Sequence, residues 1–156
     1  MTRVGLISDT HGLLRPEVAA LFDGVDRILH GGDVGGGDVL AQLRRIAPVD
    51  AVYGNVDDTA DPRLHSALDL AIDGVTIHVS HGHELGHPTP DLALARYTAQ
   101  VVVFGHTHKA VVVRAPRDRM AINPGAAGPR RFNLEPSVAI LTLDGGRADV
   151  RIVAIR

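Results

Sequence analysis

Near its start the chain reads VGLISDTHG, residues 4–12, where an apolar run leads directly into a loop of small and polar residues. Residues 4–7 contain no polar side chain, which is typical of a strand buried on both faces. Asp9 and His11 follow at the point where this strand would end. The stretch therefore predicts a buried strand whose carboxyl end carries two side chains capable of chemistry.

Short apolar runs rich in β-branched residues recur along the chain, and each predicts a further buried strand. They are residues 27–29, 50–53, 75–79 and 101–104. Three stretches between these strands have the composition and apolar spacing of helices. They are residues 16–22, with Pro at a helix-start position, residues 37–47, and residues 89–100, which begin Thr-Pro-Asp. Strands that alternate with helices indicate βαβ units and a largely parallel sheet.

After Gly105 the pattern changes to strands joined by turns, at residues 110–114, 120–123, 138–143 and 150–155. Asp144-Gly145-Gly146 is a hairpin signal, and Asp73-Gly74 between residues 67–72 and 75–79 is another. We therefore predict an α/β fold: a two-sheet α/β sandwich in which two mixed sheets are flanked by helices. Its length fits a single domain over residues 1–156.

The composition excludes several classes of protein. Hydrophobic residues make up 45% of the chain, as in a globular domain, and the formal net charge of -2 offers no basic surface for general nucleic-acid binding. The N-terminus lacks the cationic and apolar regions of a signal peptide, and no apolar run approaches the ~20 residues that span a bilayer. We therefore expect a cytoplasmic protein without membrane contact.

Histidine and cysteine usage together narrow the metal chemistry. The chain has no cysteine, so a transition metal would be bound by His, Asp, Asn or Glu. It has nine histidines, five of which gather in short motifs that also contain Gly or Asp. These five are His11, His81, His83, His106 and His108.

Five motifs carry polar side chains at the ends of predicted strands. In open α/β sheets ligands bind at the carboxyl ends of the strands, so the five loops can converge on one site. Their glycines allow the backbone to approach a ligand or an ion closely. The motifs are Ser8-Asp9-Thr10-His11-Gly12, Gly31-Gly32-Asp33, Tyr53-Gly54-Asn55, Ser80-His81-Gly82-His83 and Gly105-His106-Thr107-His108.

The spacing within these motifs suits metal binding. Asp9/His11 and His106/His108 are i, i+2 pairs, which in an extended backbone place both side chains on one side. Mixed nitrogen and oxygen donors suit Mn, Fe, Zn, Co or Ni rather than Ca. The candidates are too many for one tetrahedral ion, but a pair of ions about 3.5–4 Å apart would use them all, with one carboxylate as a bridge. The seven candidate ligands are Asp9, His11, Asp33, Asn55, His81, His106 and His108.

The order D-x-H, G-D, G-N, H-G-H, G-H-T-H resembles that of the calcineurin-like metallophosphoesterases, and in particular their small bacterial and archaeal phosphodiesterase branch. The match extends from residue 4 to about residue 131, and it includes the Asn123-Pro124-Gly125 turn and the Arg130-Arg131 pair. Each motif alone is a weak signal, but five in this order are specific. The resemblance implies that Asp9, His11, Asp33 and His108 bind one metal ion, that Asp33, Asn55, His81 and His106 bind the other, and that Asp33 is the bridge.

The resemblance also implies the reaction. It predicts a dinuclear metal-dependent phosphodiesterase or phosphatase, a hydrolase in which a hydroxide between the metals, its pKa lowered toward ~7, attacks phosphorus. We expect two divalent ions, Mn²⁺ first, with Fe, Zn, Ni or Co as alternatives. The expected substrate is a small phosphodiester or phosphomonoester.

The chain departs from this family at Val56. Many relatives carry His at this position, where it is thought to protonate the leaving group, and the small phosphodiesterase branch often carries Cys. General acid help is typically worth ~10²–10⁴-fold, so we expect substrates whose leaving groups need no proton. Asp57 is a poor acid, because a carboxyl near two cations stays ionised. His83 is the candidate replacement, and Asn55 and His83 are the candidate substrate contacts.

Alternatives to an enzyme rest on the same residues. The missing acid at Val56 favours a catalytically weak or inactive protein-binding scaffold of the same fold, like a eukaryotic retromer subunit, whereas the complete ligand set opposes it. A third hypothesis is metal-dependent regulation without turnover. The predicted strand at residues 150–155 could pair with a second chain in a homo-oligomer. We expect His30 and His78 to be hydrogen-bonded structural histidines.

Overall fold

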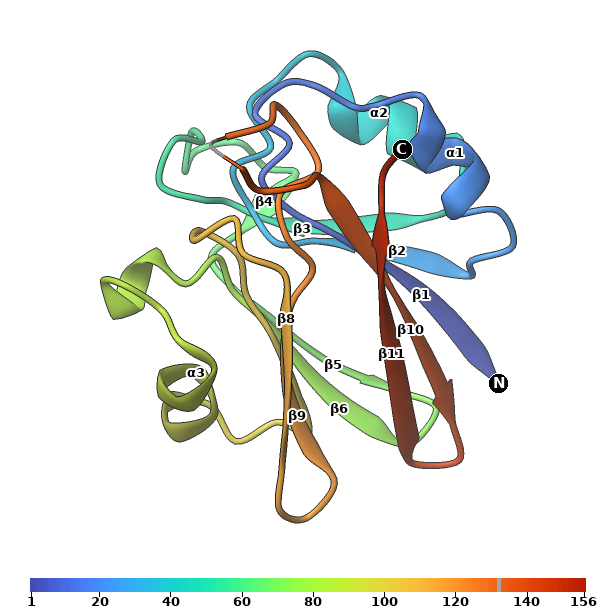
Figure 1. The fold of residues 1–156 in the computed structure, drawn as a ribbon, viewed down its shortest axis with the longest axis vertical. Coiled ribbons are helices and arrows are strands. Elements are labelled where there is room, and N and C mark those ends of the chain that lie inside the picture. Colours follow the sequence, from blue (N-terminus) through green and yellow to red (C-terminus); the bar gives the residue numbers. More distant parts are fainter. Residues whose placement is uncertain (132) are drawn as a thin grey trace.

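A computed structural model describes residues 1–131 and 133–156, and it contains two β-sheets with helices on their outer sides (Figure 1). The first sheet has six strands in the order β11-β10-β1-β2-β3-β4, and the second has five in the order β5-β6-β7-β9-β8. The strands of the first sheet are β1 (Thr2–Ile7), β2 (Arg27–His30), β3 (Val49–Val52), β4 (Leu64–His65), β10 (Ser137–Asp144) and β11 (Arg147–Ala154). Those of the second are β5 (Leu68–Ile72), β6 (Val75–Val79), β7 (Val101–Val103), β8 (Val111–Ala115) and β9 (Arg119–Asn123).

Both sheets are mixed, as the sequence predicts. In the first sheet β1, β2, β3 and β4 run parallel, whereas β10 pairs antiparallel with both β1 and β11. In the second sheet β6, β7 and β9 run parallel, with β5 and β8 antiparallel at the edges. The carboxyl ends of β1, β2 and β3 therefore lie at one edge of the first sheet, and those of β6 and β7 at one edge of the second.

The main core lies between the sheets. Val4 and Leu6 of β1 contribute to one hydrophobic cluster with Ile77 of β6 and Val103 of β7, and all four are almost completely buried. Side chains of successive strand residues point to opposite faces, so Ile7 contributes to a second cluster on the outer face of the first sheet. Strands with both faces covered read as continuous apolar runs, which explains why β1 and β7 are visible in the sequence.

In the described part of the chain, three short α-helices cover the outer faces. α1 (Glu17–Leu21) and α2 (Val39–Arg44) pack on the first sheet through buried residues such as Phe22 and Leu43. α3 (Pro90–Arg96) packs on the second sheet, with Ala93 against Phe104. The predicted fold class, a two-sheet α/β sandwich flanked by helices, is confirmed.

All three helices are shorter than predicted. α2 begins at Val39 rather than at residue 37, because Gly37 (φ 63°) and Asp38 (φ 58°) are left-handed and cannot belong to an α-helix. α3 begins where expected, since the Thr89 side chain accepts from the N–H of Leu92 and Pro90 occupies the first turn.

The early end of α3 has a tertiary cause. Its chain turns extended at Tyr97, and the guanidinium of Arg119 on β9 donates to the carbonyls of Leu94, Tyr97 and Ala99. These bonds satisfy carbonyls that the helix leaves without partners. Propensity over residues 97–100 does not reveal a contact with a strand some twenty residues later.

The two predicted hairpins are present, and two short elements were not predicted. Asp73 and Gly74 connect β5 to β6 with left-handed φ values of 51° and 80°, and Gly145 and Gly146 connect β10 to β11. The unpredicted elements are β4, which has two residues, and a 3-10 turn, η1 (His83–Leu85). Among the described residues no helix is both long and apolar enough to cross a membrane.

Candidate metal centre

The seven candidate ligands occupy loops that directly follow five strands. Asp9 and His11 follow β1, Asp33 follows β2, and Asn55 follows β3. His81 follows β6, and the pair His106 and His108 follows β7. The loops of the two sheets meet, because Nδ1 of His81 bonds the carbonyl of Gly31 at 2.8 Å and the backbone N–H of His106 donates to Oδ2 of Asp9 at 3.2 Å.

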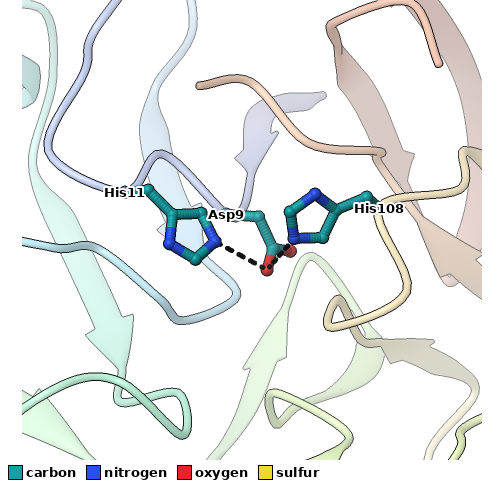
Figure 2. A group of neighbouring side chains, drawn as sticks. All are labelled: Asp9, His11 and His108. Carbon is teal, nitrogen blue, oxygen red and sulfur yellow. Dashed lines mark ion pairs between the residues drawn. The ribbon is translucent and has the colours of Figure 1, made fainter. Parts of the chain in front are cut away.

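The first group of donors consists of Asp9, His11 and His108 (Figure 2). Nε2 of His108 lies 3.3 Å from Oδ1 of Asp9, and Nε2 of His11 lies 3.8 Å from the same oxygen. The two imidazole rings stand on either side of the carboxylate, with centroids 5.3 Å apart. Asp9 is completely buried, so this carboxylate is removed from bulk water.

The second group consists of Asp33, His81 and His106. Nε2 of His81 lies 3.2 Å from Oδ2 of Asp33 and 3.3 Å from Nδ1 of His106. Asn55 joins this group, because its Oδ1 lies 3.2 Å from Nδ1 of His106. A carboxylate, two imidazoles and an amide oxygen therefore face one another.

Asp33 lies between the two groups. Its Oδ2 is 3.2 Å from His81 Nε2 in the second group and 3.7 Å from His11 Nε2 in the first. A carboxylate in this position can interact with donors or ions on both sides. The i, i+2 residues His106 and His108, by contrast, are divided between the two groups.

The backbone at these loops is not extended, and the sequence argument from extended i, i+2 pairs is wrong on this point. Asp9 (φ 53°), His11 (φ 46°), Asp33 (φ 52°), His106 (φ 71°) and His108 (φ 65°) are all left-handed. Non-glycine residues rarely adopt this region, and such strain gathers where surrounding contacts impose it. The left-handed turns, rather than alternation along a strand, aim these side chains at the centre.

In each of three candidate ligands, one polar atom of the side chain is hydrogen-bonded within the protein and the other faces the centre. Oδ2 of Asp9 accepts from Ser8 Oγ at 2.7 Å, and Oδ1 of Asp33 accepts from the N–H of Val56 at 3.1 Å. Nδ1 of His81 donates to the carbonyl of Gly31 at 2.8 Å, which leaves Nε2 unprotonated in the neutral ring. Such outer bonds orient metal ligands and fix the tautomer of a histidine.

The donors present fit divalent metal ions. Oδ1 of Asp9 and Nε2 of His11 are buried and have no hydrogen-bond partner among the described residues. Buried polar atoms are nearly always paired, so two atoms that both present lone pairs toward one point indicate a missing partner. A divalent cation satisfies both atoms, and imidazole and carboxylate donors suit the first-row transition metals.

The two carboxylates are ionised at neutral pH. Burial favours protonation of Asp33, but the hydrogen bond and the charge of His81 outweigh it and lower the pKa of Asp33 to about 2. Burial acts in the same way on Asp9, but the nearby imidazole of His108 and the charge of His81 outweigh it and lower the pKa of Asp9 below the ordinary value. Both are therefore anionic, which is the state that binds a metal.

The histidines differ from one another. Burial lowers the pKa of His11, and the charge of the exposed Arg131 adds to this effect. Burial also lowers the pKa of His106, together with the charge of His81. For His81 burial acts in the same direction, but the hydrogen bond with Asp33 outweighs it and raises the pKa. Neutral imidazoles are the form that binds metal.

His30 belongs to the support of the centre. It is completely buried, its Nδ1 accepts from the N–H of Gly32 at 3.1 Å, and its Nε2 lies 3.0 Å from Oγ1 of Thr10. Because Nδ1 accepts, the neutral ring carries its proton on Nε2 and donates to Thr10, whose hydroxyl donates to the carbonyl of Val34. Burial lowers the pKa of His30 to about 4. The expected hydrogen-bonded structural histidine is thus observed.

Asp57 has a role that sequence reasoning missed. Its carboxylate accepts from the N–H groups of Val34 at 3.0 Å, Gly35 at 3.0 Å and Gly54 at 2.9 Å. It therefore ties the loop that carries Asp33 to the loop after β3. The available signal was an Asp two residues after the Gly-Asn motif, but its partners lie 22 and 23 residues earlier.

The glycines of the motifs are required by the ligands themselves. A Cβ at residue 54 would lie 2.6 Å from Cγ of Asp33, and a Cβ at residue 105 would lie 2.6 Å from Oδ2 of Asp9. Ordinary contacts of a Cβ begin near 3.4 Å. Sequence reasoning expected close approach to an ion at these positions, whereas the backbone packs against the side chains that face the centre.

The remaining candidates lie at the periphery. His83 is in η1, with its ring centroid 5.4 Å from that of His81 and 6.4 Å from that of His106. Val56 is 57% exposed and carries no donor on its side chain. His78 bonds Asp69 at 2.8 Å on the outer face of the second sheet, as expected of a structural histidine.

Comparison with known proteins agrees with this arrangement. A model of the calcineurin-like phosphoesterase superfamily domain matches residues 2–146. A probable metallophosphoesterase of Methanothermobacter thermautotrophicus is 34% identical over 96% of this chain and 91% of its own length. Another of Bacillus subtilis, YsnB, is 32% identical over 94% and 87%.

Solved structures share the fold at lower identity. Vps29 of Chaetomium thermophilum has a TM-score of 0.81 and 19% identity, over 99% of this chain and 97% of that chain. An archaeal phosphodiesterase has a TM-score of 0.77 and 23% identity, over 97% of this chain and 100% of that chain. At such identities the likeness concerns the fold.

Proposed function

On the premise that the chain belongs to the calcineurin-like phosphoesterase superfamily, we propose that it is a metal-dependent phosphodiesterase with a dinuclear centre. The observation that carries the proposal is the pairing of two donor groups, Asp9, His11 and His108 in one and Asp33, His81 and His106 in the other, with Asp33 between them. One tetrahedral ion cannot use all of these donors, whereas two ions can.

In the proposed ligand assignment, Asp9, His11, Asp33 and His108 would bind the first ion, and Asp33, Asn55, His81 and His106 would bind the second. Asp33 would serve both ions, because its two oxygens and its negative charge would reduce the repulsion between two dications. Support comes from the 3.2 Å and 3.7 Å distances from Asp33 Oδ2 to the rings on either side.

The chain's own residues define what the reaction requires. When bound, two divalent ions would supply a water of lowered pKa for attack on phosphorus and would offset charge on the phosphate oxygens. The amide of the exposed Asn55 and the ring of His83, whose centroid lies 6.4 Å from that of His106, are the proposed contacts for a phosphate oxygen. Val56 donates no proton, so the enzyme favours esters whose leaving groups depart without one, and diesters with acidic alcohols are the first substrates to try.

Several finer predictions belong to the same proposal. We expect Mn²⁺ as the activating ion, with Fe, Zn, Ni or Co as alternatives, because mixed nitrogen and oxygen donors accept all of them. A single domain over residues 1–156, a cytoplasmic location and a small phosphodiester or phosphomonoester substrate stay predictions. So does a homo-oligomer formed through β11, which lies at an edge of the first sheet.

A protein-binding scaffold is the second candidate function. It is favoured by the exposed apolar side chain of Val56 beside the centre and by the fold shared with Vps29. It predicts that the protein binds metal without hydrolysing any activated phosphodiester.

Hydrolysis of bis(p-nitrophenyl) phosphate by metal-stripped protein, titrated with Mn²⁺, distinguishes the two. The enzyme proposal predicts activity that appears with Mn²⁺ and is lost in Asp33→Asn, while Asp149→Asn on the exposed part of β11 keeps the wild-type rate. Absence of turnover in protein that holds two equivalents of metal would refute the enzyme and favour the scaffold.

A further inference from the structure

A cavity of about 310 Å³ lies beside the centre, between the loop after β2 and the loop after β3. Val34 and Val56 line it, and they directly follow the ligand candidates Asp33 and Asn55. The N–H of Val56 donates to Oδ1 of Asp33 at 3.1 Å, so the cavity wall and the centre share this contact. A substituent on a phosphate bound at the centre therefore has room here.

The cavity has an apolar side. Val39 and Leu40, at the start of α2, are almost completely buried and line it together with Val34. Val56 adds a side chain that is 57% exposed, one of four large hydrophobic side chains that the described residues leave open to solvent. Covering this surface with the carbon skeleton of a ligand is favourable by the hydrophobic effect.

Part of the cavity lining is a run of three glycines. Gly35, Gly36 and Gly37 have left-handed φ values of 87°, 95° and 63°, and a Cβ at Gly36 would have no atom within 4 Å. No side chain from this run narrows the cavity. The wall therefore leaves space for a substituent larger than a methyl group.

The charge of the lining is strongly negative. Arg63 is the single basic residue among the lining residues, and it pairs with Asp61 at 2.7 Å. Asp58 is exposed, and its Oδ1 accepts from the N–H of Ala60 at 2.9 Å. This hydrogen bond comes from a neutral donor, so it does not neutralise the charge of the carboxylate. The lining aspartates are Asp38, Asp57, Asp58 and Asp61.

Basic residues also lie near the centre. Lys109 directly follows His108 and is exposed, and Arg131 is exposed near His11. A phosphodiester bound at the centre would meet positive charge near His11 and His108 and negative charge in the cavity beside Asn55. Charge of this kind selects among ligands more than it raises affinity in general.

Resting on the proposed phosphodiesterase function, we propose that this cavity binds one alcohol substituent of the substrate and selects a cationic alcohol with an apolar carbon frame, that is, an amino alcohol. The apolar side contacts the carbon atoms, and the aspartates Asp38 and Asp58 attract the ammonium group. An anionic substituent, such as a second phosphate or a carboxylate, is repelled.

Three p-nitrophenyl phosphodiesters test this selectivity at low ionic strength with Mn²⁺-loaded protein. Their second alcohols are choline, 3,3-dimethylbutanol, which has the shape of choline without the charge, and 4-hydroxybutyrate, which is anionic. Two unit charges about 4 Å apart in water interact enough to change an equilibrium about fivefold. We therefore expect kcat/KM for the choline ester to exceed that for the neutral ester about fivefold to tenfold, and the anionic ester to fall below the neutral one by a similar factor.

Variants and salt dependence test whether Asp38 and Asp58 cause the selectivity among the three esters. In the double variant Asp38→Asn and Asp58→Asn the three rates should converge, whereas Asp91→Asn, which removes an exposed carboxylate of α3, should leave the order unchanged. In 1 M salt, where the screening length is about 3 Å, the order should also weaken. Equal rates for the three esters, a preference for the anionic one, or an order unaffected by the double variant would overturn the proposal.

A binding measurement separates this proposal from the proposed function. Calorimetric titration with phosphocholine and with 3,3-dimethylbutyl phosphate compares the same two substituents without turnover. Tighter binding of phosphocholine, lost in the double variant, supports the amino-alcohol cavity even in a protein that hydrolyses none of the esters. Equal affinities in an active enzyme would refute the cavity proposal and leave the phosphodiesterase intact.

Discussion

Replacing Gly54 by alanine adds one methyl group at the point where the loop after β3 passes Asp33. The new Cβ would lie 2.6 Å from Cγ of Asp33, whereas ordinary contacts of a Cβ start near 3.4 Å. Relief of this overlap would move the carboxylate of Asp33 by about 1 Å, because Gly54 contacts the carboxylate itself. A misplacement of that size can cost ~10²-fold in rate. The φ of Gly54 is not left-handed, so the backbone itself accepts alanine and the effect comes from the overlap.

The displacement should act on metal binding before it acts on folding. Metal–ligand distances tolerate roughly 0.2 Å, so a bridging carboxylate moved by about 1 Å cannot serve both groups of donors. We expect Gly54→Ala to lose at least about 100-fold in kcat/KM. The free energy of unfolding should fall by about 1–3 kcal/mol, the usual cost of one extra methyl group in a packed site.

The assay is Mn²⁺-dependent hydrolysis of bis(p-nitrophenyl) phosphate, and metal content and urea unfolding are measured on the same protein. Gly145→Ala is the matched control, since its Cβ would meet nothing within 4 Å in the turn between β10 and β11 and its φ is 56°. This control should lose about 1 kcal/mol of stability and keep its activity. If Gly54→Ala binds two equivalents of metal and stays within a fewfold of the wild-type rate, close packing against Asp33 does not position the centre.

Three further outcomes follow from single features. His30 has a native pKa of about 4 against an ordinary 6.5, so only the unfolded chain takes up this proton between those values. The free energy of unfolding should therefore fall by about 3 kcal/mol as pH drops through that window. The variant His30→Asn, which keeps an acceptor for the N–H of Gly32, should show a flatter pH dependence in urea titrations, and an unchanged slope would contradict the assignment. Val56→His should raise kcat for esters with alkyl leaving groups by up to about 100-fold while changing p-nitrophenyl esters little, and equal gains for both would argue against a proton donor at this position. Metal at 100 times its Kd should stabilise the protein by about 2.7 kcal/mol, or roughly 5–10 °C in Tm by calorimetry, and a Tm indifferent to chelator would count against binding by these buried donors.

The sequence predicted the strands well, together with the loops that carry the polar motifs, and the reasons can be identified. β1 and β7 are covered on both faces, so their residues form continuous apolar runs, whereas β6 alternates apolar residues with Thr76 and His78. The motifs that follow these strands stand at carboxyl ends, and parallel strands bring such ends to one edge. Pattern and topology therefore agreed on where the polar side chains meet.

Features that depend on distant contacts were not predictable in the same way. The end of α3 is determined by Arg119, and the start of α2 by the left-handed Gly37 and Asp38, neither of which a helical apolar pattern reveals. The two residues of β4 are too few for any periodicity. Asp57 looked like a poor acid beside the Gly-Asn motif, and only its three N–H partners identify it as the tie between two loops.

The geometry of the ligands was the part of the site that the sequence predicted least well. Extended backbone at the i, i+2 pairs was the simplest way to aim two side chains together, yet His106 and His108 sit in left-handed turns and belong to different groups of donors. Sequence motifs fix which residues are present and in what order. They do not fix which atom of Asp9 or His81 is bound by the protein and which faces the centre.

Anomalous diffraction from crystals of the protein loaded with Mn²⁺ tests the central claim most directly. The account predicts two peaks about 3.5–4 Å apart, one beside Asp9, His11 and His108 and one beside Asn55, His81 and His106, with Asp33 between them. A single peak, or two peaks that share no carboxylate, would contradict the dinuclear centre.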